Sequence, residues 1–149
     1  MSTNAAIVSP MHLVLQVLAA AQALEKSGQR IFRSHGLTVA KFNVLNLLSD
    51  QPDGMRASDL ARALIVDRSN VTGLIKRMKK DGLLQEVETA HDRRQHVVTL
   101  SPKGRAAWSA ADPAYEKGLA ELVAGLSPAN RKVAETVLQR LIAKTSILP

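Results

Sequence analysis

Residues 68–80 read RSNVTGLIKRMKK, and their polar and basic side chains gather on one side of a predicted helix. An asparagine amide on such a surface can form two hydrogen bonds to an adenine edge, and hydroxyl groups can contact bases or phosphates. Lysine and arginine side chains can neutralise phosphates. The segment therefore predicts a helix that binds duplex DNA through Arg68, Ser69, Asn70, Thr72, Gly73 and Lys76. Lys79 and Lys80 also suit phosphate contact.

The apolar residues of the same segment predict which side of the helix faces inward. They recur at three- and four-residue steps and are expected to face a protein core: Val71, Leu74, Ile75 and Met78. Gly73 costs about 1 kcal/mol relative to alanine in a helix interior. Close approach of the helix backbone to DNA explains this glycine, and neutral drift on an exposed surface explains it equally.

A second basic sequence, Asp92-Arg93-Arg94, is predicted to form the loop of a hairpin whose strands are residues 83–88 and 95–100. In such a loop Arg94 or Arg93 can enter a narrow minor groove while its neighbour contacts phosphate. Asp92 is expected to support this wing by orienting an arginine, either Arg77 or Arg68. The helix followed by the hairpin predicts a winged helix-turn-helix.

Apolar periodicity and capping residues predict the elements before the hairpin. A long helix covers about residues 10–34, and Thr38 caps a second helix that ends near Ser49. The helix-turn-helix is expected to comprise a helix at 58–64, a turn at 65–67 with Asp67 as the next helix cap, and a helix at 68–80. Asp81-Gly82 ends that helix.

Two further helices are predicted after the hairpin. Ser101-Pro102 places a capping hydroxyl before a proline at the first helical position, and Ser127-Pro128 repeats the pattern. The first of these helices runs towards Leu126, and Pro113 is expected to kink or divide it. The last helix, from 130 to about 146, is expected to bury Val133, Val137, Leu138, Leu141 and Ile142.

The predicted fold class is mainly α: a winged helix-turn-helix with a two-stranded β wing, flanked by N- and C-terminal dimerisation helices. The predicted boundaries are 1–36 for the N-terminal dimerisation helix, 37–101 for the DNA-binding module and 102–149 for the C-terminal dimerisation helices. Apolar stripes on the flanking helices favour a homodimer, which would place two recognition helices ~34 Å apart. The alternative is that these helices pack only on their own module.

Composition favours a nucleic-acid partner and excludes thiol chemistry. The chain of 149 residues has a net charge of +7, and residues 56–105 hold eleven Lys or Arg against six Asp or Glu. This surplus favours a polyanionic partner, although an ordinary solvated surface also explains it. The chain has no cysteine, which excludes disulfides and thiolate metal sites. Its four histidines are scattered, so no metal and no other cofactor is expected.

Residues 11–23 have the apolar character of a signal peptide, but no Lys or Arg precedes them, and His12, Gln16 and Gln22 interrupt them. The segment is also too short and too polar to span a bilayer. We therefore expect a cytoplasmic protein without a membrane partner.

The chain resembles the MarR family of bacterial transcription regulators over nearly its whole length. Five sequence matches together carry the resemblance: 58–61 (SDLA), 66–74 (VDRSNVTGL), 80–84 (KDGLL), 92–94 (DRR) and 100–105 (LSPKGR). The resemblance implies a triangular homodimer that binds a pseudo-palindromic operator and usually represses. It also implies that Ser69, Asn70, Thr72 and Gly73 face the major groove and that Arg94 enters the minor groove.

The resemblance further implies a small, often phenolic or anionic effector that binds between the dimerisation helices and the DNA-binding module and weakens DNA binding. Residues on the bordering helices that are candidate ligand contacts are His12, Arg30, Arg33, His35 and Phe42. Each of them is also explained as a packed or solvated residue.

The chain departs from the family pattern at two places. Arg56 replaces a common capping Thr or Ser, so the third helix is expected to be capped less well, or by Ser58. Glu86 and Glu88 occupy a wing strand where arginine is common, so they either lower DNA affinity or point away from DNA.

Two other classes of protein fit the sequence less well. An enzyme is disfavoured because no Gly-rich phosphate loop, metal triad or nucleophile elbow is present and no His or carboxylate is placed to activate Ser69. A winged helix that binds a partner regulator instead of DNA is supported by the two wing glutamates. The preferred interpretation is a ligand-responsive homodimeric repressor.

Overall fold

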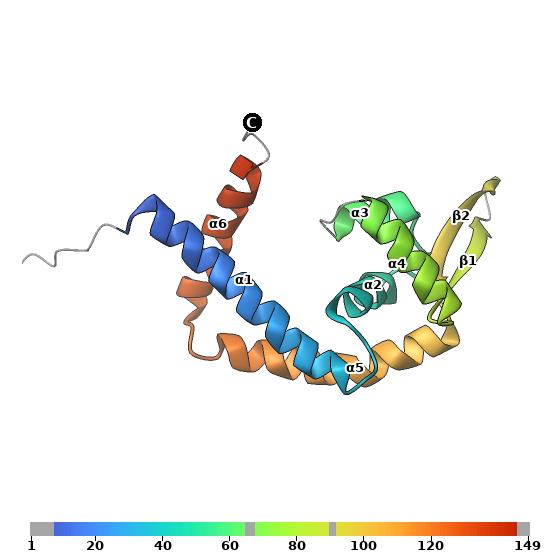
Figure 1. Ribbon diagram of the computed structural model, residues 1–149, viewed down its shortest axis with the longest axis horizontal. Helices are drawn as coiled ribbons and strands as arrows, with labels where there is room; N and C mark the ends of the chain where they lie inside the picture. The colour runs from blue at the N-terminus through green and yellow to red at the C-terminus, as the bar shows by residue number, and fades with distance from the viewer. Residues whose placement is uncertain (1–7, 65–67, 90–91, 146–149) are drawn as a thin grey trace, which may run out of the picture. The chain divides into compact units, whose positions relative to one another are not determined.

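The computed structural model describes residues 8–64, 68–89 and 92–145. Its elements follow in the order α1 (Pro10–Arg33), α2 (Val39–Ser49), α3 (Ala57–Ala63), α4 (Arg68–Lys80), β1 (Leu84–Thr89), β2 (Asp92–Leu100), α5 (Pro102–Val123) and α6 (Pro128–Thr145) (Figure 1). The chain divides into two compact units, Met1–Asp112 and Pro113–Pro149. The mainly helical fold with one two-stranded wing is the predicted class.

Side-chain caps begin the first two helices. The hydroxyl of Ser9 accepts a hydrogen bond from the His12 amide at the start of α1, and Thr38 accepts one from the Lys41 amide at the start of α2. Between the helices, the Phe32 and Phe42 rings stack with centroids 4.2 Å apart. The caps therefore set where each helix begins, and the aromatic pair packs one helix against the other.

The helix-turn-helix is formed by α3 and α4, which pack against each other. Helix α3 begins and ends one residue earlier than predicted, and no side chain caps it at Arg56, as the sequence indicated. Helix α4 has the predicted bounds, and it ends before Gly82, whose φ of 75° is the left-handed conformation that glycine favours. The predicted turn at 65–67 and the Asp67 cap lie outside the described residues.

The wing is an antiparallel hairpin in which Leu84 pairs with Leu100 and Glu88 pairs with His96. The prediction that residues 92–94 form a loop is wrong, because β2 begins at Asp92 and Thr89 pairs with it. A register shift between Glu88 and Thr89 accommodates this pairing. The pairing of Thr89 with Asp92 thus extends β2 back to Asp92, a residue type whose local preference is for turns.

The core of the first unit lies between α2, α3, α4 and the wing. Its largest fully buried side chains come from α1, α2, α3 and α4: Phe32, Phe42, Val44, Leu45, Leu48, Leu60, Val71 and Met78. Val98 and Leu100 of β2 are also buried, which confirms that they share one side of the hairpin. The aromatic content is low, so aliphatic side chains fill most of this space.

The start of α5 is anchored to the turn that follows α4. The Ser101 hydroxyl accepts a hydrogen bond from the Gly104 amide at 2.9 Å and donates one to the Gly82 carbonyl at 2.6 Å. Gly104 approaches Leu83 so closely that a Cβ built on it would lie 1.9 Å from the Leu83 carbonyl oxygen. Of the outcomes expected at Pro113, division of the helix is wrong, because α5 continues through it to Val123.

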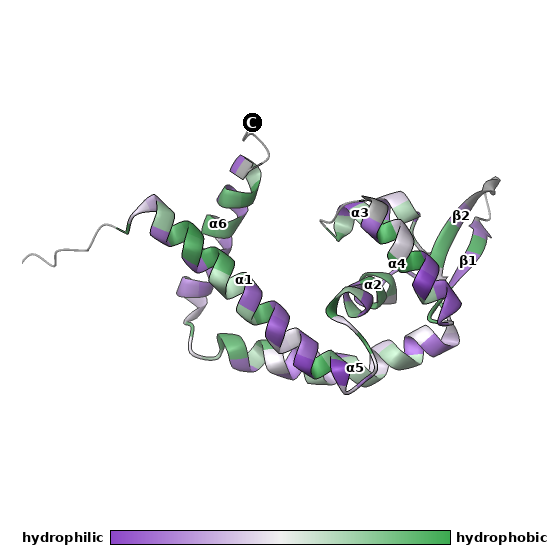
Figure 2. Ribbon diagram, in the orientation of Figure 1, coloured by the Kyte–Doolittle hydropathy of each residue, from purple (hydrophilic) through white to green (hydrophobic). Residues whose placement is uncertain are grey.

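Large apolar side chains of α1 and of α6 are exposed, each helix considered within its own unit. Figure 2 shows hydrophobic residues along both helices. On α1 they include Leu15 and Leu18, and on α6 they include Val133 and Ile142. Within its own unit α6 leaves this stripe uncovered, so the expected burial stays a prediction, since the sequence pattern marks an apolar surface but not the surface that covers it. In the described part of the chain no helix is long and apolar enough to cross a membrane.

Gly104→Ala is expected to lower the free energy of unfolding by about 1–3 kcal/mol or more, because the new methyl group collides with backbone and the helix start must move. Gly125→Ala is the matched control, since a Cβ there meets nothing within 4 Å. Urea denaturation followed by circular dichroism measures both variants. Equal stability of the two variants would contradict the close contact.

Candidate nucleic-acid interface

Helix α4 has one buried side and one exposed side. Val71, Ile75 and Met78 are buried, and Leu74 is half-buried, so the predicted inward side is confirmed. Asn70, Thr72 and Lys76 are exposed. Because the inward side is held in the core, the polar side faces solvent in one fixed orientation, and its amide, hydroxyl and ammonium groups are the types that contact base edges and phosphates.

Arg77 belongs to the same exposed surface, although the sequence assigned it only to wing support. A Cβ built on Gly73 would lie 3.4 Å from Nη1 of Arg77, so the guanidinium extends back over the glycine one helical turn earlier. The four-residue spacing was the signal that sequence reasoning missed. The bond predicted between Arg77 and Asp92 stays a prediction, because the Asp92 side chain lies outside the described residues.

Several predicted contact residues are placed by backbone alone. Arg68 and Ser69 form the first turn of α4, and Asp92, Arg93 and Arg94 form the first residues of β2. The side chains of these five residues are not among those that the structure describes. Their assigned contacts to DNA therefore stay predictions.

Glu86 is bound to α4 by an ion pair. Its carboxylate Oε2 accepts a hydrogen bond from Nζ of Lys79, and this hydrogen bond lowers the pKa of Glu86, an effect that partial burial opposes. Both side chains remain more than a third exposed, so the pair contributes at most about 1 kcal/mol to stability. Lys79 is therefore paired with strand β1 of the wing, and its positive charge offsets the negative charge of Glu86.

Glu88 lies two residues further along β1 on the same side of the hairpin, since side chains alternate along a strand. Its cross-strand neighbour is His96, and both side chains are exposed. Glu88 thus carries an exposed negative charge on the outer wing, where it lowers the positive potential that the module presents.

The C-terminal end of α4 is fastened to two other helices. The Asp81 carboxylate accepts a hydrogen bond from Nζ of Lys41 in α2 at 2.7 Å. The backbone carbonyl of Asp81 accepts one from Nζ of Lys103 in α5, also at 2.7 Å. The Lys41 hydrogen bond and charge hold the pKa of Asp81 below its ordinary value of 3.8. These contacts fix where α4 ends relative to α2 and the start of α5.

The structure does not gather the five candidate ligand residues. The Phe42 side chain is fully buried against Phe32, and His12 and Arg33 lie near opposite ends of α1, ~30 Å apart at 1.5 Å per residue. Arg30 is exposed and donates to the Ser27 hydroxyl at 3.3 Å. His35 alone of the five lines a described hollow, of about 330 Å³, together with Lys41 and Lys103.

Comparison with known proteins identifies the fold family. The family model described as MarR family matches residues 35–95. A solved structure of BpsR from Bordetella bronchiseptica is similar over 85% of this chain and 98% of that one, with 32% identity and a TM-score of 0.65. The chain belongs to the MarR family. The BpsR structure was determined to explain how 6-hydroxynicotinic acid regulates the DNA binding of that protein.

Of two curated relatives in the MarR family, one activates transcription and the other represses it. The transcriptional activatory protein BadR of Rhodopseudomonas palustris is 41% identical over 98 residues, which are 64% of this chain and 56% of that protein. The homoprotocatechuate degradative operon repressor of Escherichia coli is 25% identical over 131 residues, 88% of each protein. The match to BadR thus spans little more than half of its length.

Gly73→Ala is expected to raise the free energy of unfolding by roughly 0.5–1 kcal/mol, because alanine is the better helix former and its Cβ meets only the flexible end of Arg77. The same change is expected to weaken binding to duplex DNA if the glycine allows close approach of the helix. Chemical denaturation and fluorescence anisotropy measure the two effects. A stabilised variant with undiminished DNA affinity would show that close approach is not the reason for the glycine.

Asp81→Asn is expected to lower the thermal midpoint at neutral pH, because it removes the Lys41 ion pair. The folded pKa of Asp81 is depressed, so its contribution is present above the unfolded pKa and is lost as pH falls below about 3.8. The difference in midpoint from the parent protein should therefore shrink with acidification. Glu25→Gln on the exposed surface of α1 is the control, and a difference that persists at low pH would contradict the ion-pair origin.

Proposed function

We propose that this MarR-family protein is a homodimeric transcription regulator that represses from a pseudo-palindromic operator and is released from it by a small-molecule ligand. The observation that carries the proposal is the exposed side of α4. It presents Asn70, Thr72 and Lys76 outward, with the Arg77 guanidinium over Gly73, while the opposite side is buried. A helix held in this way can enter a major groove with its polar residues toward base edges.

The homodimer is supported by the exposed apolar residues of α1 and α6. Leu15, Leu18, Val133 and Ile142 are among the large apolar side chains that their own units leave exposed. Their burial by a second copy would remove a large apolar area from water, at about 25 cal/mol per Å². A two-fold dimer would also match the symmetry of a pseudo-palindromic operator.

Repression and ligand release are supported by the relatives. One relative is an operon repressor and another an activatory protein, and DNA binding by a third is regulated by 6-hydroxynicotinic acid. An effector of the same type, a small aromatic acid, is proposed for this chain. Either sign of regulation uses the same DNA-binding surface, and repression follows where the operator overlaps a promoter.

The proposal is tested by two variants that remove different contributions to DNA binding. Asn70→Ala removes a base contact, and Lys76→Gln removes a phosphate contact. Asn70→Ala is expected to weaken binding to a specific duplex by roughly 1–3 kcal/mol and to affect a scrambled duplex much less. Lys76→Gln is expected to weaken both duplexes alike and to reduce the salt slope by about one, since one phosphate contact is lost. The measurement is fluorescence anisotropy over a salt series with a duplex from the intergenic region beside the gene.

The same titration distinguishes a DNA-binding from a protein-binding winged helix. Salt-sensitive preference of the parent protein for the intergenic duplex supports the regulator. Weak, equal binding of both duplexes, unchanged in both variants, would overturn the proposal. It would favour the winged helix as a protein-interaction module, for which the exposed Glu88 on the wing is the available support.

A further inference from the structure

The outer wing carries a carboxylate directly opposite a histidine. Glu88 of β1 pairs in register with His96 of β2. Two residues further along β2, Val98 exchanges both of its backbone hydrogen bonds with Met55, at 3.0 and 2.8 Å, and directs none at β1. Because this direction alternates along a strand, Glu88 and His96 form a pair without backbone hydrogen bonds between them. In such pairs the two side chains lie closer together.

Glu88 and His96 lie on the side of the hairpin that faces α4. Glu86 precedes Glu88 by two residues and is therefore on the same side, where it binds Lys79 of α4. The Lys79 hydrogen bond and charge hold the pKa of Glu86 below its ordinary value, and the charge of His96 adds to this effect. The histidine is thus within electrostatic reach of this strand's carboxylates.

Glu88 lacks the compensating charge that Glu86 receives. It forms no ion pair with any residue whose side chain the structure describes. Lys79 is already bound to Glu86. Helix α2 also packs against β2, and its one charged side chain, Lys41, is bound to Asp81. The group that can balance the Glu88 charge is therefore the imidazole opposite it, once that imidazole is protonated.

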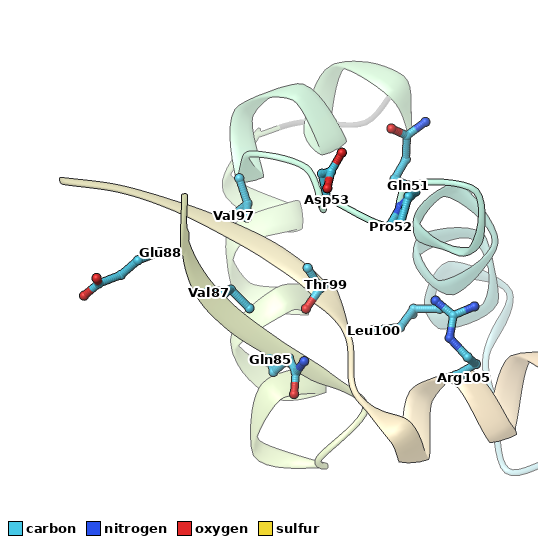
Figure 3. A pocket seen from close by; sticks show the side chains of 10 residues that line it. All are labelled: Gln51, Pro52, Asp53, Gln85, Val87, Glu88, Val97, Thr99, Leu100 and Arg105. Carbon is cyan, nitrogen blue, oxygen red and sulfur yellow. The ribbon is translucent and has the colours of Figure 1, made fainter. Parts of the chain in front are cut away.

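The pair is open to solvent at the end of the module where DNA is expected. Both side chains are exposed, and in Figure 3 Glu88 points away from Val87 and from the other labelled side chains. Figure 1 shows the outer end of the hairpin and the start of α4 at the same end of the unit. Arg94, the predicted minor-groove residue, precedes His96 by two residues on β2, although its side chain is not among those described. A duplex that receives the start of α4 therefore passes close to the pair.

We infer that His96 makes DNA binding by the wing depend on pH. A histidine side chain changes from neutral to positive roughly between pH 8 and pH 5. Neutral His96 leaves the Glu88 charge to repel the phosphates, whereas protonated His96 cancels it. Duplex affinity therefore rises as pH falls through this range. The inference rests on the proposed DNA binding and adds a form of regulation to the same surface.

The test is fluorescence anisotropy of the full-length protein at about pH 8 and about pH 5.5, at one ionic strength, with the intergenic duplex and a scrambled duplex. The parent protein is expected to bind both duplexes about two- to fivefold more tightly at the lower pH, the scale of one exposed charge interaction. His96→Gln is expected to lose this difference. His96→Lys is expected to bind at both pH values as tightly as the parent binds at the lower one, because lysine stays charged.

Two further variants separate the pair from other sources of pH dependence. Glu88→Gln removes the negative charge itself, so it is expected to tighten binding at about pH 8 as much as acidification does in the parent. His12→Gln is the matched control, since it removes an exposed histidine on α1 and should keep the parent's pH dependence. The thermal midpoint of each variant, measured at both pH values, checks that it is folded.

Calorimetry in two buffers of different ionisation enthalpy gives an independent readout. Because coupling between two bound species is reciprocal, duplex binding should take up protons in the parent protein and not in His96→Gln. Proton uptake that His96→Gln leaves unchanged would overturn the inference. So would a pH difference in affinity that persists in His96→Gln or that His12→Gln abolishes.

The two duplexes separate this inference from the proposed function. If the parent protein prefers the intergenic duplex equally at both pH values and with equal affinity, the pH dependence fails and the regulator stands. If it shows no preference but binds the scrambled duplex more tightly at the lower pH through His96, the pH dependence stands and operator recognition fails. If neither duplex binds at either pH, both fail.

Discussion

Burial of one side of α4 is the constraint on which the DNA-binding geometry depends. Val71, Ile75 and Met78 enter the core with little or no exposed surface, and each fully buried side chain of this size stabilises the fold by roughly 1.5–3 kcal/mol. Rotating the helix would expose all three residues at once. The outward direction of Asn70, Thr72 and Lys76 follows from this energetic cost, because no specific polar contact is needed to aim them.

The turn after α4 converts this orientation into a fixed position. Gly82 reverses the chain in a conformation that favours glycine, and Gly104 lets α5 start directly on the Leu83 carbonyl. Asp81 then joins lysines from α2 and α5, one through its carboxylate and one through its carbonyl. Steric contact determines how closely these elements approach one another. The exposed ion pair helps to orient them and contributes little to stability.

The charge that the wing presents depends on which charged residues form ion pairs as well as on how many there are. Glu86 would oppose a phosphate backbone if it were alone, yet Lys79 compensates it and joins β1 to the helix. Glu88 remains exposed beside His96, so the outer wing is less positive than the lysine and arginine content of the module indicates.

Local signals in the sequence determined the helix limits set by Thr38, Ser101 and Gly82, and apolar periodicity determined the inward side of α4. These features act within a few residues, so a single sequence contains them. Only the tertiary structure decided that residues 92–94 continue a strand, that Lys79 meets Glu86, and that Phe42 is a core residue. Such contacts join separate elements, and backbone pairing or burial there outweighs local preference. The apolar stripe of α6 was visible in the sequence, but whether it is covered depends on a surface outside the helix itself.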